Sequence, residues 1–302
     1  MPARDLVGEL TVADIGIPDT IVRAHDVGLR ANAPSRWRMH MPERTPGSHK
    51  YHHGHAVVVG GPAPATGACR LSARAALRVG AGLVSVVCEP AATPTYAADT
   101  AAIITRPVSD RGSLDIVLSD RRVTAVLVGP GAGIGPRTID IVQAVLAHRR
   151  GIVLDADALT SFSACRDDLF RGLRVDCVMT PHDGEYARLF DDEGDRLTRA
   201  LAGARKAGAV VLLKGADTVV ASPDGRAAIQ PAAPPALATA GSGDVLAGIV
   251  LGLLAQGMPA FEAACAATWL HAASVAGSTG GIIADDLPDR VGRLVEARAA
   301  AA

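Results

Sequence analysis

Aromatic side chains are scarce in this chain of 302 residues, of which phenylalanine, tryptophan and tyrosine together make up 3%. So few rings argue against a surface on which nucleic-acid bases stack, and they leave Ala, Val, Leu and Ile to build the core. An excess of basic residues is also missing, because 30 Lys and Arg stand against 31 Asp and Glu. Proteins that hold nucleic acid through its phosphates usually carry such an excess, so we expect no nucleic-acid partner.

Membrane-spanning runs and paired cysteines are missing as well. The long apolar stretch at 245–255 has eleven residues, whereas about 20 are needed to cross a bilayer. Residues 1–10 lack the continuous apolar region of a secretory signal, so we expect a cytoplasmic protein without membrane contact. The five cysteines contain no C-x-x-C pair, which favours reduced thiols over a zinc site. A histidine-rich stretch at 49–55 has no carboxylate or cysteine beside it, and no metal ligand is assigned.

From residue 55 onward the chain alternates short apolar runs with helical stretches. Strands buried on both faces are predicted at 56–59, 83–88, 125–128, 151–154, 177–179 and 210–213. Helices are predicted at 68–79, 136–148, 197–207, 244–256 and 261–277, and a hairpin at 217–230. This alternation is typical of an α/β fold with three layers, in which helices flank a central, mainly parallel sheet.

The strongest candidate for chemistry is the segment Ala-Thr-Ala-Gly-Ser-Gly-Asp at 238–244, which directly precedes an apolar helix. Main-chain N–H groups at a helix start bind anions such as phosphate, and we predict that Gly241, Ser242 and Gly243 supply them. Asp244 is explained either as the helix N-cap or as a general base beside the anion. The small residues before Asp244 favour the base.

Further candidates follow other predicted strands, so in a parallel sheet they meet at its carboxyl edge. After one strand come His182, Asp183 and Glu185. The two carboxylates are also explained by a helix start, whereas His182 has less structural reason to be there. Lys214 and Gly215 follow another predicted strand. Lys214 offers a positive charge to a nucleotide, and Gly215 allows the backbone to approach the nucleotide closely.

Two more loops complete this set. The segment Gly-Pro-Gly-Ala-Gly at 129–133 leaves room for a bulky planar ligand, although its spacing is not the G-x-G-x-x-G dinucleotide fingerprint. Asp155 and Asp157 stand two residues apart after a strand and could hold Mg²⁺ through water. For Asp157 we favour a second role, as the cap of the turn that follows.

Taken in this order, the motifs resemble those of the NAD(P)H-hydrate dehydratase family of the ribokinase-like superfamily, whose members repair nicotinamide cofactors with a hydrated ring. The resemblance covers residues 47 to about 300. Its motifs are His49-Lys50, Val59-Gly60-Gly61, Thr66-Gly67-Ala68, 76–83, 129–131, 154–159, 180–185, Lys214-Gly215 with Thr218, and 238–248. The chain departs from the usual family pattern at 51–53 and at Pro235.

The resemblance implies a ribokinase-like fold that holds a nucleotide at the carboxyl edge of its sheet, with ADP as co-substrate and Mg²⁺ required. It assigns Ala68, Gly131 and His182 to the hydrated nicotinamide nucleotide and Asp244 to the substrate hydroxyl. It assigns the adenine nucleotide to Lys214, Gly215, Ala216, Asp217, Thr218 and Gly243. It also implies a homo-oligomer, since members of the family tend to form tetramers.

The predicted function is therefore the ADP-dependent dehydration of the S form of hydrated NADH or NADPH, which yields NADH or NADPH, AMP and phosphate. Such an enzyme is a hydro-lyase. Two rival functions stay open at this point. One is a ribokinase-like small-molecule kinase that phosphorylates a vitamin precursor, and the other is a non-catalytic nucleotide sensor.

The first 46 residues form a separate region that is polar and rich in proline. Residues 10–18 read as a short strand, and residues 13–18 resemble the closing strand of the epimerase domain that often precedes this dehydratase in a fused protein. We expect residues 1–46 to be a loosely ordered remnant of that domain, without epimerase activity. Residues 47–302 are then the dehydratase domain.

Overall fold

The computed structural model describes residues 11, 13–25, 28–43, 45, 47–231, 234–278 and 280–299. They contain a ten-stranded sheet with the strand order β1-β10-β9-β8-β7-β6-β5-β2-β3-β4. The strands are β1 (Leu29–Ala31), β2 (His55–Val59), β3 (Leu83–Cys88), β4 (Ile104–Pro107), β5 (Val123–Val128), β6 (Gly151–Leu154), β7 (Cys177–Met179), β8 (Val210–Leu213), β9 (Val219–Ala221) and β10 (Ala227–Ile229). Only β9 runs against its neighbours, so the predicted mainly parallel sheet and its hairpin are confirmed.

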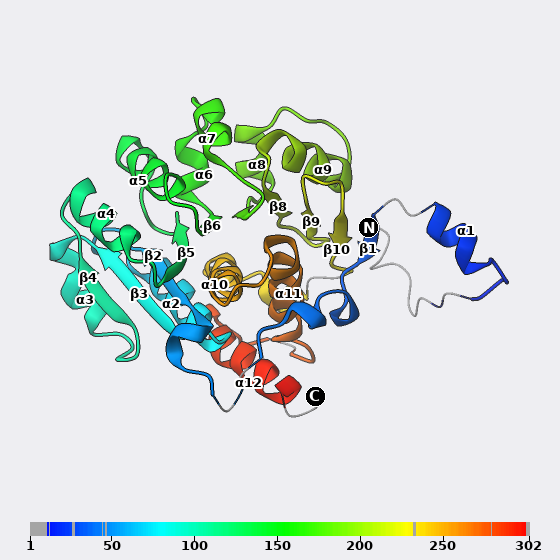
Figure 1. Ribbon diagram of the computed structural model, residues 1–302, viewed down its shortest axis with the longest axis horizontal. Helices are drawn as coiled ribbons and strands as arrows, with labels where there is room; N and C mark the ends of the chain where they lie inside the picture. The colour runs from blue at the N-terminus through cyan, green and yellow to red at the C-terminus, as the bar shows by residue number, and fades with distance from the viewer. Residues whose placement is uncertain are drawn as a thin grey trace.

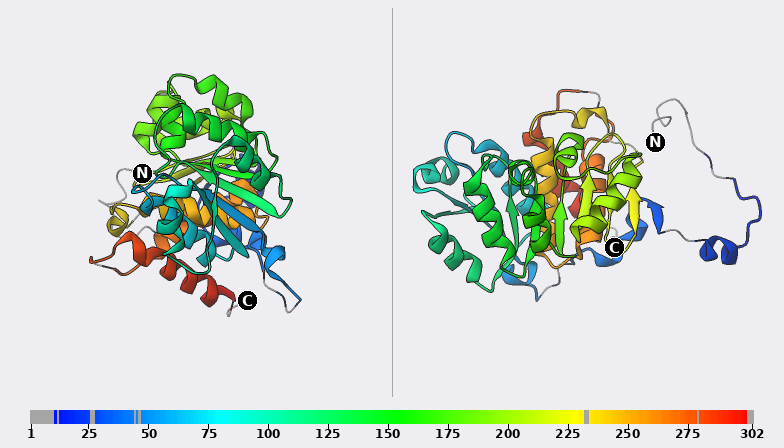
Figure 2. Two further views of the ribbon diagram at one scale, coloured as in Figure 1. Left: turned by 90° about the vertical axis from the view of Figure 1, so that its left-hand side faces the viewer. Right: turned by 90° about the horizontal axis from the view of Figure 1, so that it is seen from above.

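Helices cover both faces of this sheet and make three layers (Figures 1 and 2). One face carries α4 (Arg111–Ser119), α5 (Pro136–Leu146), α6 (Asp157–Ser161), α7 (Arg166–Gly172), α8 (Asp183–Leu189) and α9 (Arg196–Ala207). The other carries α2 (Gly67–Arg78), α10 (Ser242–Ala255), α11 (Ala260–Ala273) and α12 (Leu287–Ala299). The short helices α1 (Asp19–Ala24) and α3 (Thr93–Ala97) lie towards the ends of the sheet.

The central strands are mostly apolar because each of their faces meets a helical layer. In β2, Ala56 and Val58 belong to the core on the α10 side, whereas Val57 and Val59 belong to the core on the α5 side. Successive side chains of a strand point to opposite faces, so apolar residues are needed on both faces. This is the pattern from which the parallel sheet was predicted.

The helix α10 lies in the middle of one layer and is buried nearly all round. It packs directly on α2, and glycine makes the close approach possible. A Cβ atom at Gly248 would lie 2.2 Å from the carbonyl oxygen of Ser72, and one at Gly252 would lie 2.6 Å from that of Ala76. Ser72 also donates a hydrogen bond from Oγ to the carbonyl oxygen of Asp244 (2.8 Å). These contacts fix the start of α10 relative to α2.

In the part of the chain that the structure describes, no helix is both long and apolar enough to cross a membrane. Although α10 is the most hydrophobic helix, its 14 residues are fewer than the roughly 20 that a bilayer requires.

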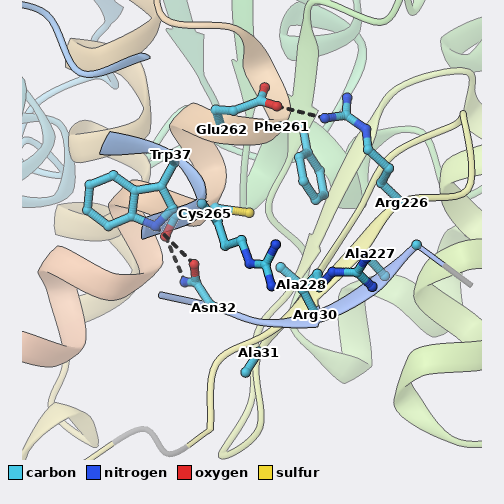
Figure 3. Close-up of a pocket in the computed structure, with 12 residues that line it drawn as sticks. Arg30, Ala31, Asn32, Trp37, Arg226, Ala227, Ala228, Phe261, Glu262 and Cys265 are labelled. Atoms are coloured by element: carbon cyan, nitrogen blue, oxygen red, sulfur yellow. Dashed lines mark hydrogen bonds and ion pairs between the residues drawn. The ribbon is translucent and has the colours of Figure 1, made fainter. Parts of the chain in front are cut away.

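The N-terminal segment differs from the expectation that residues 1–46 are loosely ordered. The strand β1 pairs in parallel with β10 at the edge of the sheet. Trp37 is 1% exposed and donates from Nε1 to Asn32, which donates in turn to the carbonyl oxygen of Cys265 on α11 (Figure 3). A buried tryptophan with a partner for its N–H anchors this segment, so for residues 29–37 the expectation is wrong.

Residues 13–18 form no strand, and Thr11 is likewise irregular, so the short strand predicted at 10–18 is absent from its described part. Instead Ile15 and Ile17 are exposed, as are Ile21 and Val22 on α1. Residues 1–10 lie outside the described residues.

The close packing of α10 on α2 makes a prediction for stability. Gly248→Ala should lower the free energy of unfolding by at least about 2 kcal/mol, because the new methyl group collides with the main chain of Ser72. Gly112→Ala on the exposed surface of α4 is the matched control, since its Cβ meets nothing closer than 3.6 Å. That change should stabilise by roughly 0.5–1 kcal/mol. Urea denaturation measures both, and equal effects of the two substitutions would contradict the packing argument.

Candidate active site

The loops that follow β5, β6, β7 and β8 meet the start of α10. The 129–133 loop is tied to α6 by a hydrogen bond from the N–H of Gly133 to Oδ2 of Asp157 (2.8 Å). A Cβ atom at Gly131 would lie 2.7 Å from the carbonyl oxygen of Ala65 and 3.8 Å from Cβ of Ala68. The predicted substrate residues Ala68 and Gly131 are therefore neighbours. Asp157 serves as a tie between loops, and our preferred role for it as a helix cap is wrong, because the N-cap of α6 is Ala156.

Lys214 stands at the centre of a group of carboxylates. Its Nζ lies 2.7 Å from Oδ1 of Asp155 and 3.8 Å from Oε2 of Glu185, and a Cβ atom at Gly243 would lie 3.6 Å from it. Burial opposes the charge on Lys214, but the two carboxylates outweigh burial and raise its pKa. Lys214 thus stays a cation beside the first turn of α10.

His182 has a structural task that the sequence did not reveal. It is the N-cap of α8, and its Nδ1 accepts hydrogen bonds from the N–H groups of Gly184 (2.9 Å) and Glu185 (3.2 Å). Glu185 completes a capping box by accepting from the N–H of His182 at 2.8 Å. Nδ1 is engaged in this way, and Nε2 lies 3.4 Å from Oε1 of Glu185, while the His182 side chain remains 55% exposed.

Arg196 was not predicted, yet it joins two of the predicted loops. Its guanidinium group donates to Oδ2 of Asp183 (2.7 Å), to Oδ1 of Asp217 (3.0 Å) and to the carbonyl oxygen of Lys214 (2.7 Å). Burial raises the pKa of Asp183, but hydrogen bonds from Arg196 and Arg199 outweigh it, so the net direction is downward. No motif marks Arg196 in the sequence, because its partners lie in loops that only the fold brings together.

The other predicted adenine-nucleotide residues form the turn after β8. Thr218 is buried, and its hydroxyl accepts from the N–H of Gly215 and donates to the Gly215 carbonyl oxygen. The hydroxyl is therefore used to close the turn. Ala216 is exposed at the tip, and Asp217 is paired with Arg196.

Asp244 occupies the third position of α10 and does not cap it. The N-cap is Gly241, which has φ +86° and makes no side-chain cap, a conformation that favours glycine. Asp244 is half-buried. Burial raises its pKa to about 6, the charge of Asp155 adds to this effect, and the charge of Lys214 opposes it. Of the two roles that the sequence left open for Asp244, the geometry fits a proton acceptor.

The main-chain donors of this turn differ in part from the prediction. Ser242 donates its N–H to the carbonyl oxygen of Thr239 (3.3 Å), so this amide is not available to a ligand and its predicted role as a donor is wrong. The N–H groups of Gly241, Gly243 and Asp244 have no acceptor within the described part of the chain. Three donors thus remain at the positive end of the α10 dipole.

The comparisons with known proteins agree with this geometry. A family model described as NAD(P)H-hydrate dehydratase matches residues 56–287. The chain belongs to the NAD(P)H-hydrate dehydratase family. It is 37% identical over 263 residues to the ADP-dependent (S)-NAD(P)H-hydrate dehydratase of Neisseria meningitidis, covering 81% of this chain and 86% of that protein.

Longer members of the family match as well. The bifunctional NAD(P)H-hydrate repair enzyme of Moorella thermoacetica is 39% identical over 287 residues, which are 90% of this chain and 54% of that enzyme. The counterpart in Salinibacter ruber is 37% identical and is covered over 58% of its length. The chain therefore spans little more than half the length of these curated relatives.

Solved structures confirm the ribokinase-like fold. A ribokinase-like superfamily protein from Enterococcus faecalis superimposes with a TM-score of 0.81 at 25% identity, over 89% of this chain and 96% of that one. The ADP/ATP-dependent NAD(P)H-hydrate dehydratase of Bacillus subtilis, co-crystallised with ATP and Mg²⁺, gives a TM-score of 0.73 at 26% identity, over 91% and 99% of the two chains.

The raised pKa of Asp244 makes a second prediction. The native state binds its proton more tightly than the unfolded chain does, so the stability that Asp244 contributes is present below about pH 4 and is lost as the pH rises through about 6. Asp244→Asn should therefore stabilise the protein relative to wild type at pH 8 by about 1–3 kcal/mol more than at pH 5. Asp140→Asn, at an exposed position of α5, is the control for removal of a surface carboxylate. Equal effects of Asp244→Asn at both pH values, measured by urea denaturation, would contradict the assignment.

Proposed function

We propose that this chain catalyses the ADP-dependent dehydration of the S form of hydrated NADH or NADPH. The observation that carries the proposal is the position of Asp244. The Asp244 carboxyl group has a pKa of about 6. It lies in the same turn as the three N–H groups that have no acceptor among the described residues, and Lys214 lies beside this turn. The Neisseria relative is named for the same activity. Residues 47–302 are then the dehydratase domain, and within them 56–287 match the family model.

In this reaction Asp244 takes the proton from the hydroxyl group of the hydrated ring. A carboxylate with a pKa of about 6 is ionised at neutral pH and yet basic enough to accept that proton. The freed oxygen attacks the β-phosphorus of ADP, the bond from that phosphorus to the bridging oxygen breaks, and AMP leaves. The ring nitrogen then expels phosphate, and loss of a proton from the neighbouring ring carbon restores NADH or NADPH.

The first turn of α10 stabilises the negative charge that moves across the phosphoryl oxygens. The N–H groups of Gly241, Gly243 and Asp244 are fixed in place before the reaction, which is the arrangement that lowers such a barrier. Lys214 adds a positive charge beside Gly243. Removing one such donor in other enzymes costs about 10²–10³ in rate, so this turn is the main source of catalysis after Asp244.

Mg²⁺ fits the side chains present, although they do not form a cage for it. Within the described residues no group of three ligating side chains could hold a metal alone, and Mg²⁺ commonly binds through one or two carboxylates, water and substrate phosphates. Asp155 and Glu185 would hold the ion through water. The charge of the bound ion would reduce the repulsion between the phosphates and the carboxylates of this site, those of Asp155, Asp157, Glu185 and Asp244.

The surrounding loops bind the two nucleotides. The hydrated nicotinamide is bound by Ala68, Gly131 and the exposed side chain of His182. The turn from Lys214 to Thr218, which Arg196 holds by the carbonyl oxygen of Lys214, contacts the adenine nucleotide together with Gly243. We further propose a cytoplasmic homotetramer. The five cysteines form no disulfide, which suits a reducing compartment.

A direct assay tests the proposal. The purified chain is incubated with hydrated NADH, ADP and Mg²⁺, and the near-ultraviolet absorbance of reduced nicotinamide is followed together with released phosphate. Both should appear in equal amounts, and Asp244→Asn should lower the rate at least about 10³-fold. The dependence of kcat/KM on pH should show an acidic limb near pH 6, where Asp244 titrates.

Three outcomes would contradict the proposal. A vitamin-precursor kinase would leave hydrated NADH unchanged and phosphorylate a hydroxyl of another substrate. A nucleotide sensor would bind ADP without releasing phosphate. Near-normal turnover by a folded Asp244→Asn variant would remove the base assigned here, and Asp140→Asn again serves as the control for charge removal elsewhere.

A further inference from the structure

Ser242 lies inside the turn that we propose to bind phosphate, yet its N–H and its hydroxyl group both have partners within the protein. Its N–H closes the turn on Thr239 (3.3 Å), and its Oγ lies 3.1 Å from Nε2 of His271 on α11. Ser242 is 5% exposed and His271 is 7% exposed. This contact therefore crosses the buried boundary between α10 and α11.

The His271 ring is buried on α11, and Ser242 contacts it through a side-chain hydrogen bond. Burial lowers its pKa to about 4, and the charge of Lys214 acts in the same direction, so the ring is neutral at physiological pH. A neutral imidazole in an apolar helix costs free energy unless a polar partner satisfies it. Ser242 is that partner, and it connects His271 to the turn whose free N–H groups include those of Gly241 and Gly243.

We propose that His271 is a positioning residue, which holds the 239–243 turn through Ser242 so that the free N–H groups point at the transferred phosphoryl group. This proposal rests on the proposed function. We call the His271–Ser242 contact the latch. His271 itself touches no reacting atom.

The geometry explains why such a latch is needed. The turn is rich in small residues, and Gly241 has the left-handed conformation, so its own backbone restrains it little. On its α2 side, the start of α10 is held by the hydrogen bond from Ser72 to the carbonyl oxygen of Asp244. The latch holds the α11 side. Donors that stabilise a transition state must keep their positions to within about 0.5 Å, and a misplacement of about 1 Å can cost 10²-fold in rate.

Three variants test the latch, and the chain provides a matched control. His271→Phe and Ser242→Ala each remove the contact, whereas His271→Gln keeps a polar atom near the position of Nε2. The control is Ser85→Ala, because Oγ of Ser85 lies 2.7 Å from Nε2 of His55 in a second buried serine–histidine pair, on β2 and β3. Loss of either hydrogen bond should cost similar stability, but only the latch lies beside the site.

Two measurements are made on each variant. The first is steady-state kinetics with hydrated NADH and ADP. His271→Phe and Ser242→Ala should each lower kcat about tenfold or more with KM for hydrated NADH changed less than about threefold. The double variant should be no worse than either single one, and His271→Gln should recover most of the rate. Ser85→Ala should keep kcat within twofold.

The second measurement is hydrogen–deuterium exchange of the peptide that contains residues 238–244. Exchange should accelerate in His271→Phe and Ser242→Ala but not in Ser85→Ala. The proposal is overturned if exchange of this peptide is unchanged, or if the kinetic losses of the two single variants multiply. If wild-type protein does not dehydrate hydrated NADH, the proposed function fails, and the exchange measurement still decides whether the latch holds the turn.

Discussion

The close contact between α2 and α10 is the constraint on which the site depends. Glycine at 248 and 252 allows the two main chains to approach within distances that any side chain would prevent, and the hydroxyl of Ser72 then fixes the carbonyl group of Asp244. Because α2 also carries Ala68 at its start, the same contact sets the distance between Ala68 and Asp244. A helix that is buried nearly all round cannot shift without disturbing the core, so its position relative to α2 is fixed.

The electrostatic character of the site follows from this rigidity. Burial raises the pKa of Asp244 to about 6, and the charges of Asp155, Asp157 and Glu185 act in the same direction, whereas the charge of Lys214 opposes them. Asp155 and Glu185 are paired with Lys214, whereas Asp244 is held by the helix at a place where burial opposes its charge. The environment of Asp244, rather than its residue type, therefore gives it the raised pKa that its proposed role as proton acceptor requires.

Much of the fold could be predicted from the sequence because both faces of the central strands are buried, and the fold brings the predicted strand-end motifs to the same edge of the sheet. What was missed depends on contacts between distant segments. Trp37 completes an edge of the core through Asn32 and α11, and Arg196 joins loops that are far apart in the sequence. His182 and Ser242 lie in motifs that were identified, but nothing in a linear pattern shows that an imidazole caps a helix or that an amide is already bonded.

The proposed reaction depends on Asp244 being a half-buried carboxylate that accepts a proton at neutral pH. Its most direct test is a titration of the Asp244 side-chain carboxyl carbon by NMR, with the signal assigned by its absence in Asp244→Asn. We expect a midpoint of about 6 in the protein without nucleotide. A midpoint at or below about 4, the ordinary value for aspartate, would contradict it, because such a group would be too weak a base for the proton transfer on which the reaction relies.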